Sequence, residues 1–260
     1  MIHKTAIIED GAKIGKNVCI GPYSIISSKV VIGDNVKIKS HVVIEGKVTI
    51  GEETVIYPFA SLSYPQTLKY SGEDSEIIIG KKNVIREYVT IQHGTLEGGM
   101  KTQIGDNCLL MVGVHIAHNC CIGNNAIFAN YVSLAGHVKV GNFVTIGGLS
   151  AVQQFCRIGS YAMIGGMSGI ARDVIPYGLA SNKRANLEGV NLVGMKRHGF
   201  DRKKTIEASK ATKILFTEVR NDSFNRRVEK VSENFKDNDI VKEILEFVHS
   251  DKTRSFCKFE

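Results

Sequence analysis

Residues 8–38 read IEDGAKIGKNVCIGPYSIISSKVVIGDNVKI, with an isoleucine at every sixth position. The aliphatic series continues to Leu62, resumes over 79–91 and runs again over 104–170. Glycine often follows the aliphatic residue, and a small or β-branched residue usually stands four places after it. A period of six fits neither an isolated amphipathic helix nor a simple alternating strand.

The period is typical of a parallel β-helix, in which each hexad forms a short strand and a turn with its aliphatic residue inward. Three hexads, about 18 residues, make one coil of a triangular prism, so residues one coil apart lie above one another. The aliphatic hexad positions predict roughly eight coils spaced by about 4.8 Å. We therefore predict a mostly β fold, although the period does not determine the hand of the coil.

Two segments, 63–78 and 92–103, interrupt the period. They are too long for tight turns, so we expect them to protrude as loops, where binding groups usually lie. From about residue 185 the apolar positions have helical spacing. We predict a β-helix domain over 1–184 and a C-terminal α-helical domain over 185–260 with three or four helices. Their apolar positions are Ile206, Ala208, Ala211, Ile214, Leu215, Val219, Ile240, Ile244, Leu245 and Val248.

Composition limits the class of protein. The 260 residues contain no apolar run long enough to cross a membrane, and the N-terminus lacks the apolar core of a signal peptide. We therefore expect a cytoplasmic protein with no integral membrane segment. Its six cysteines should then be reduced thiols. Three of them, Cys108, Cys120 and Cys156, fall at the small inward position of the hexad and are predicted to be buried and structural.

The net charge of +7 is uneven along the chain. Residues 181–260 hold 18 Lys and Arg against 13 Asp and Glu. A basic C-terminal third indicates an acidic partner, but its sign does not distinguish nucleic acid, an acidic protein and an anionic substrate.

The stretch GVHIAHNCCIG, residues 113–123, places two histidines beside the inward Ile116. His118 is one coil from Gly136, which is one coil from Gln154, and His137 adjoins this column. A neutral imidazole can act as a general base, and a corner glycine can aim its N–H at a developing oxyanion. Three imidazoles could instead hold zinc. The spacing leaves both chemistries open.

Three motifs extend this pattern: HIAHN at 115–119, LAGH at 134–137 and GVNLVGMKRHGF at 189–200. Together they resemble the UDP-N-acetylglucosamine O-acyltransferase family, the acyl-carrier-protein-dependent first enzymes of lipid A synthesis. The resemblance covers the whole chain. It implies a left-handed parallel β-helix of hexapeptide repeats and a homotrimer whose active sites lie in clefts between neighbouring prisms.

The implied reaction transfers a (3-hydroxy)acyl chain from an acyl carrier protein thioester to the 3-hydroxyl of UDP-N-acetylglucosamine. No separate cofactor is implied, because the acyl chain arrives on the carrier's phosphopantetheine. Acyl carrier protein is strongly acidic, so it becomes the expected partner of the basic C-terminal third, in preference to nucleic acid.

The resemblance also assigns roles to residues. His118 matches the general base and Gly136 the residue whose N–H holds the oxyanion. Gly166 matches the position that limits acyl-chain length, with Met163 and Met167 also able to shorten that pocket. No metal ligand is implied. The matching substrate-binding positions are Gln66, Thr67, Lys69, His115, His137, Gln154, Asn191 and Arg197.

Some positions depart from the expected family pattern. Thr67 stands where an Asp usually contacts the sugar, Val193 where a Glu is expected, and Gln92 and Gln153 where His is frequent. These departures leave open a 3-amino UDP-sugar as acceptor, which would give an amide. The N-acyltransferase acting later in the same pathway is a related alternative, although it usually carries an extra N-terminal domain. From another class, a zinc-dependent hexapeptide-repeat carbonic anhydrase remains open.

Overall fold

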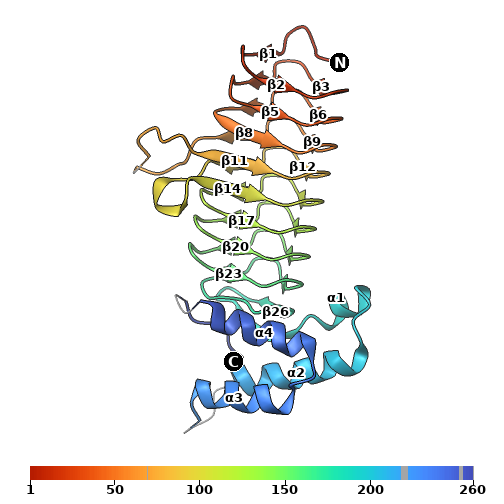
Figure 1. Cartoon of the computed structure of the whole chain (residues 1–260), viewed down its shortest axis with the longest axis vertical. Helices are drawn as coiled ribbons and strands as arrows, with labels where there is room; N and C mark the ends of the chain where they lie inside the picture. The colour runs from red at the N-terminus through yellow and green to blue at the C-terminus, as the bar shows by residue number, and fades with distance from the viewer. Residues whose placement is uncertain (69, 218–221, 252–253, 260) are drawn as a thin grey trace.

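The chain winds into a triangular prism whose three faces are parallel β-sheets, with helices at its C-terminal end (Figure 1). The computed structural model describes residues 1–68, 70–217, 222–251 and 254–259. Strands of one face pair in parallel one coil apart, as Ile7 pairs with Ile25 and Ile8 with Ile26. The predicted mostly β fold with a parallel coil is confirmed.

Each face of the prism is one sheet, in which the strands follow one another in chain order. Sheet 1 contains β1 (Ile7–Ile8), β4 (Ile25–Ile26), β7 (Val43–Ile44), β10 (Ser61–Ser63), β13 (Thr90–Gln92), β16 (His115–Ile116), β19 (Ser133–Leu134), β22 (Ala151–Val152) and β25 (Gly169–Ile170). Sheet 2 contains β2 (Lys13–Ile14), β5 (Val31–Ile32), β8 (Lys47–Ile50), β11 (Glu76–Ile79), β14 (Lys101–Ile104), β17 (Cys121–Ile122), β20 (Lys139–Val140) and β23 (Arg157–Ile158). Sheet 3 contains β3 (Cys19–Ile20), β6 (Lys37–Ile38), β9 (Val55–Ile56), β12 (Val84–Ile85), β15 (Leu109–Leu110), β18 (Ile127–Phe128), β21 (Thr145–Ile146), β24 (Met163–Ile164), β26 (Gly178–Ser181) and β27 (Asn186–Val190).

The strands are short because each hexad supplies one outward and one inward residue before the chain turns. In β6, Lys37 is exposed and Ile38 is buried. Burying such an aliphatic side chain stabilises the fold by about 1.5–3 kcal/mol. Asn83 occupies a small inward position, and its amide is paired there: it donates to the Gly105 carbonyl (2.9 Å) and accepts from the Cys108 N–H (2.8 Å). The predicted burial of Cys108, Cys120 and Cys156 is confirmed.

Two loops protrude from the same edge of the prism, where sheet 1 passes into sheet 2 (Figure 1). Residues 64–75 connect β10 to β11, and residues 93–100 connect β13 to β14 through a short 3₁₀ turn at Leu96–Gly98. We call this edge the loop edge. His118 follows β16 and precedes β17, so it lies on the loop edge as well.

Beyond the coils, β26 and β27 form an antiparallel hairpin that ends sheet 3. The predicted boundary between residues 184 and 185 falls in the turn of this hairpin, and the division into two domains stays a prediction. The helices that follow are α1 (Leu192–Arg197), α2 (Arg202–Phe216), α3 (Phe224–Asn234) and α4 (Asp239–Ser250).

The predicted inward face of the helices is confirmed for α4, whose Ile240, Ile244, Leu245 and Val248 are buried. Of the apolar series in α2, Ala208, Ala211 and Leu215 are buried, whereas Ile206 is 45% exposed. Val219 lies outside the described residues.

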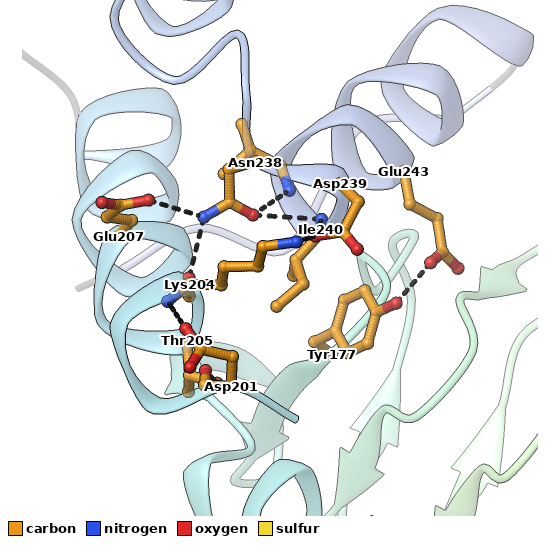
Figure 2. Close-up of polar contacts among 10 residues, drawn as sticks. Tyr177, Asp201, Lys204, Thr205, Glu207, Asn238, Asp239, Ile240 and Glu243 are labelled. Carbon is orange, nitrogen blue, oxygen red and sulfur yellow. Dashed lines mark hydrogen bonds and ion pairs between the residues drawn. The ribbon is translucent and has the colours of Figure 1, made fainter. Parts of the chain in front are cut away.

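Polar contacts fix α2 against α4 (Figure 2). The Asn238 side chain accepts from the N–H groups of Ile240 and Val241 at the start of α4 and donates to the Lys204 carbonyl and the Glu207 carboxylate of α2. The hydroxyl of Tyr177, which precedes β26, donates to Glu243 of α4. The Asn238 bonds join α2 to α4, and the Tyr177 bond joins α4 to the last coil.

A buried ion pair strengthens that junction. Arg157 of β23 lies 2.7 Å from Asp173, and both side chains are almost fully buried. The same guanidinium donates to the Ser250 hydroxyl (2.8 Å) and the Asp251 carbonyl (3.0 Å) after α4. Across the described residues, no helix is long and apolar enough to cross a membrane.

Candidate active site

His118 and Gly136 lie in successive turns of the loop edge. The His137 N–H donates to the His118 carbonyl (3.0 Å), which places the two turns one above the other. A Cβ added to Gly136 would lie 2.6 Å from Cε1 and 2.9 Å from Nε2 of His118. The backbone of Gly136 therefore packs against the imidazole, and a larger residue would displace that ring. The stacking predicted from the coil length is confirmed.

The Asn119 side chain determines which nitrogen of His118 carries the proton. Nδ1 of His118 lies 2.8 Å from Oδ1 of Asn119. An amide oxygen only accepts hydrogen bonds, so Nδ1 must donate. In the neutral imidazole the other nitrogen, Nε2, is then left with a free lone pair. That tautomer is ready to accept a proton at Nε2, beside Gly136.

The backbone N–H of Gly136 is free, unlike its equivalents on another edge. Between sheets 2 and 3, the backbone N–H at the same turn position donates to an Asn side-chain oxygen one coil later. The Asp106 N–H donates to Oδ1 of Asn124 (2.7 Å), and the Asn124 N–H donates to Oδ1 of Asn142 (2.7 Å). Within the described part of the chain, no group accepts from the Gly136 N–H. Its neighbour Ala135 donates to the Val152 carbonyl. Gly136 can therefore direct its N–H toward a ligand.

Two further histidines flank His118. Nδ1 of His115 lies 2.7 Å from the Thr90 hydroxyl, and burial lowers the pKa of His115. The His137 ring meets His118 edge-on, with centroids 5.1 Å apart. Burial and the nearby charge of His118 lower the pKa of His137, while Glu97 opposes them. Across residues whose positions are described, no group of three or more His, Cys, Asp or Glu side chains is placed to hold a metal ion.

His115, His118 and Gly136 line a pocket of about 310 Å³ on the face of sheet 1 beside the loop edge, whereas His137 does not line it. Its floor is made of small residues, among them Ser133, Ala135 and Ala151. The predicted site residues that it brings together are Gln66, His115, His118, Gly136 and Gln154. The pocket can therefore hold a polar substrate group beside both the imidazole and the free amide.

The first protruding loop is anchored over this pocket. The Gln66 N–H donates to the Gln92 side-chain oxygen (3.3 Å). The buried ring of His93 lies 2.9 Å from the Ser75 carbonyl and 2.8 Å from the Glu45 carbonyl, so it ties the end of the loop to the turn before β8. Thr67 follows Gln66 in this loop and is half-buried. The predicted ligand Lys69 lies outside the described residues.

Other predicted site residues do not line this pocket. Asn191 caps α1, accepting from the Gly194 N–H (3.0 Å) and donating to the Tyr161 carbonyl (3.0 Å). Arg197 is exposed at the end of α1. Met163 lies in β24, and the exposed Gly166 turns from sheet 3 toward sheet 1. Their functional roles stay predictions.

Sequence reasoning missed Asn119 and Thr95. The Thr95 N–H and hydroxyl both donate to Oδ1 of Asn119, and Nδ2 of Asn119 donates back to the Thr95 carbonyl. Asn119 follows the predicted base directly, and asparagine tolerates the left-handed backbone (φ 61°) that this corner requires. Thr95 belongs to a loop outside the repeat, so no periodic signal points to it.

Comparisons with known proteins agree with this fold. The family described as bacterial transferase hexapeptide (six repeats) matches residues 29–63 and 101–136. The family described as Udp N-acetylglucosamine O-acyltransferase; Domain 2 matches residues 173–257. The two matches fall on the coils and on the C-terminal helices respectively.

Relatives that align with the whole chain share the name of one enzyme. The acyl-[acyl-carrier-protein]–UDP-N-acetylglucosamine O-acyltransferase of Rickettsia canadensis is 58% identical over 260 residues, covering 100% of this chain and 98% of that protein. The Rickettsia prowazekii protein of the same name is 57% identical with the same coverage. Among solved structures, the UDP-N-acetylglucosamine acyltransferase from Campylobacter jejuni is 37% identical, covers 100% of both chains and has a TM-score of 0.92. The Bacteroides fragilis enzyme is 35% identical, with a TM-score of 0.95 over 99% of this chain and 100% of that one.

The repeat, the histidine pocket and these matches define a hexapeptide-repeat acyltransferase with a left-handed β-helix. Within that class, the chain belongs to the UDP-N-acetylglucosamine O-acyltransferase family.

Proposed function

We propose that the protein transfers a (3-hydroxy)acyl chain from an acyl carrier protein thioester to the 3-hydroxyl of UDP-N-acetylglucosamine, at the start of lipid A synthesis in the cytoplasm. The names of its full-length relatives support this substrate pair. The observation that carries the mechanism is the His118 imidazole, held through Nδ1 by Asn119 and packed against the free amide of Gly136.

His118 acts as the general base. Its Nε2 takes the proton of the sugar 3-hydroxyl while that oxygen attacks the thioester carbonyl carbon. A carbon–oxygen bond forms and the carbon–sulfur bond then breaks. The imidazolium returns its proton to the departing phosphopantetheine sulfur, which restores the base. The acyl donor brings its own prosthetic group, so the protein needs no cofactor for these steps.

Gly136 stabilises the charge that develops on the thioester oxygen. A backbone donor already in place costs no reorganisation when the tetrahedral intermediate forms. The free N–H beside His118 supports this role, since the matching amides between sheets 2 and 3 are capped by Asn side chains. A base and an oxyanion donor in successive turns suit one reacting carbonyl.

The remaining substrate contacts are proposed to come from both walls of an intersubunit cleft in a homotrimer. Gln66, Thr67, His137 and Gln154 belong to the loop edge or its two loops, and His115 lies on β16 beside it, whereas Asn191, Arg197, Gly166 and Met163 lie outside the His118 pocket of their own chain. Lys69 is proposed as a further substrate contact. In this arrangement a neighbouring chain supplies the nucleotide contacts and the surface that limits acyl length.

A 3-amino UDP-sugar is the second candidate acceptor. Thr67 supports it, because a hydroxyl replaces the carboxylate that the family pattern places beside Gln66. An amine nucleophile also loses a proton on acylation, so the same base would serve.

The test is turnover of full-length protein against both UDP-sugars with a series of acyl carrier protein thioesters, read by mass spectrometry. His118→Ala is expected to lower kcat by about 10²–10⁴-fold, the usual contribution of a general base. The control is Cys121→Ser, which changes an exposed thiol outside the pocket and should leave kcat unaltered. Near-normal turnover by folded His118→Ala would remove His118 as the base.

A further inference from the structure

We propose that Thr95, in the second protruding loop, is a positioning residue for the catalytic base. It holds the Asn119 amide in the orientation that keeps the proton of His118 on Nδ1. The inference rests on the proposed role of His118 and extends it to a loop residue that does not line the His118 pocket.

The polarity of three hydrogen bonds fixes the Asn119 amide. Thr95 donates twice to Oδ1 of Asn119, through its N–H (3.1 Å) and its hydroxyl (2.7 Å). Nδ2 of Asn119 donates to the Thr95 carbonyl (3.1 Å). A flipped amide would set Nδ2 against the Thr95 N–H and Oδ1 against the Thr95 carbonyl, so neither backbone bond could form.

That orientation is transmitted to the imidazole. With Oδ1 held toward His118, Nδ1 can approach to 2.8 Å only as a donor. Without Thr95, rotation of the amide would bring Nδ2 toward the ring, and Nδ1 would then become the acceptor. The proton would move to Nε2, and the tautomer so formed cannot accept the substrate proton there.

Burial and packing around Thr95 and Asn119 strengthen the hydrogen bonds that orient the Asn119 amide. Thr95 and Asn119 are each 8% exposed, and hydrogen bonds are electrostatically stronger in such low-dielectric surroundings. The Asn119 N–H donates to the buried Thr102 hydroxyl on β14 (2.8 Å). A Cβ added to Gly98 would lie 2.3 Å from Cγ of Asn119, so the loop backbone packs directly on the amide. Residues 93–100 therefore hold the Asn119 side chain through hydrogen bonds and backbone packing.

The test uses Thr95→Val in the full-length protein, which removes the hydroxyl donor and keeps the shape and the backbone. Nitrogen NMR of ¹⁵N-histidine protein above neutral pH, with His118 assigned by comparison with His118→Ala, reports the tautomer. We expect Nδ1–H in the natural protein and a detectable fraction of Nε2–H in Thr95→Val, because the two backbone bonds of residue 95 alone then hold the Asn119 amide. We expect kcat to fall by about tenfold, in line with one buried hydrogen bond. KM for the UDP-sugar should stay within about twofold, because Thr95 does not line the pocket. Thr95→Ser should restore both the tautomer and kcat.

Thr102→Val is the matched control. It removes a hydroxyl that is also buried and also bonded to Asn119, but to its backbone N–H rather than its amide. We expect it to lower stability and leave the His118 tautomer unchanged. A natural protein with Nε2–H, or Thr95→Val with an unaltered tautomer and kcat, would overturn the proposal. So would an equal tautomer shift in Thr102→Val. If His118→Ala keeps its turnover, the proposed base fails, whereas the tautomer spectrum still decides the role of Thr95.

Discussion

Oδ1 of Asn119 lies 2.8 Å from Nδ1 of His118, so a neutral amide rather than a carboxylate orients the imidazole. An amide oxygen fixes the tautomer without adding a negative charge beside the ring. The loop edge thereby keeps Nε2 available as a base while leaving the imidazolium without a countercharge from Asn119.

Asn119→Asp tests this arrangement. A carboxylate would stabilise the imidazolium, so we expect the acid limb of the pH–rate profile to move to higher pH. It would also set an oxygen against the Thr95 carbonyl in place of Nδ2, which should lower the free energy of unfolding by about 1–3 kcal/mol. Steady-state kinetics from pH 5 to 9 and thermal unfolding measure the two effects. A profile that coincides with that of the natural protein would show that the amide's neutrality is unimportant.

Gly136→Ala should lower kcat by displacing the base. The added Cβ would lie 2.6 Å from Cε1 of His118, while the backbone N–H is kept. The φ of Gly136 is outside the left-handed region, so alanine is not strained by its backbone. We expect a loss of about 10²-fold or more in kcat, measured under saturating substrates. In the His118→Ala background the same substitution should have no further effect, because the ring it displaces is gone.

The positions of the coil residues that support the site could be predicted because the coil is regular. A period of six leaves one inward aliphatic position per hexad, so the inward placement of Ile116 and Cys120 followed from counting. A coil of three hexads likewise placed Gly136 against His118. In both cases each position depends only on its phase in the repeat, and no distant contact is needed to determine it.

Features outside the repeat could not be found this way. The clamp of Thr95 on Asn119 depends on how residues 93–100 fold, and that loop has no period. In α2 the apolar Ile206 faces solvent because α3, α4 and β27 together determine which side of the helix is covered. Helical spacing alone cannot choose between two neighbouring faces of similar polarity.

Arg157 should be essential to the junction between the coils and the helices. Its pair with Asp173 is almost fully buried, and Arg157→Met would leave that carboxylate without its partner. Breaking such a pair costs about 3–5 kcal/mol. Thermal unfolding of Arg157→Met should show this loss. The control is Lys29→Met, which breaks the exposed pair with Asp74 and should leave the unfolding midpoint nearly unchanged. Equal shifts in the two variants would contradict the importance of burial.

Acidification should destabilise the fold through His115 and His137. Burial lowers the pKa of both histidines in the folded chain, so between that value and the unfolded value of about 6.5 the unfolded chain binds more protons. Their contribution to stability is therefore present above about pH 6.5 and is lost as the pH falls. We expect the unfolding midpoint to drop between pH 7.5 and 5.5, and less steeply in His115→Gln and His137→Gln. Ser133→Ala, which changes the neighbour of His115 on β19 without removing a titrating group, should keep the natural slope. A slope unchanged in both histidine variants would assign the pH dependence to other groups.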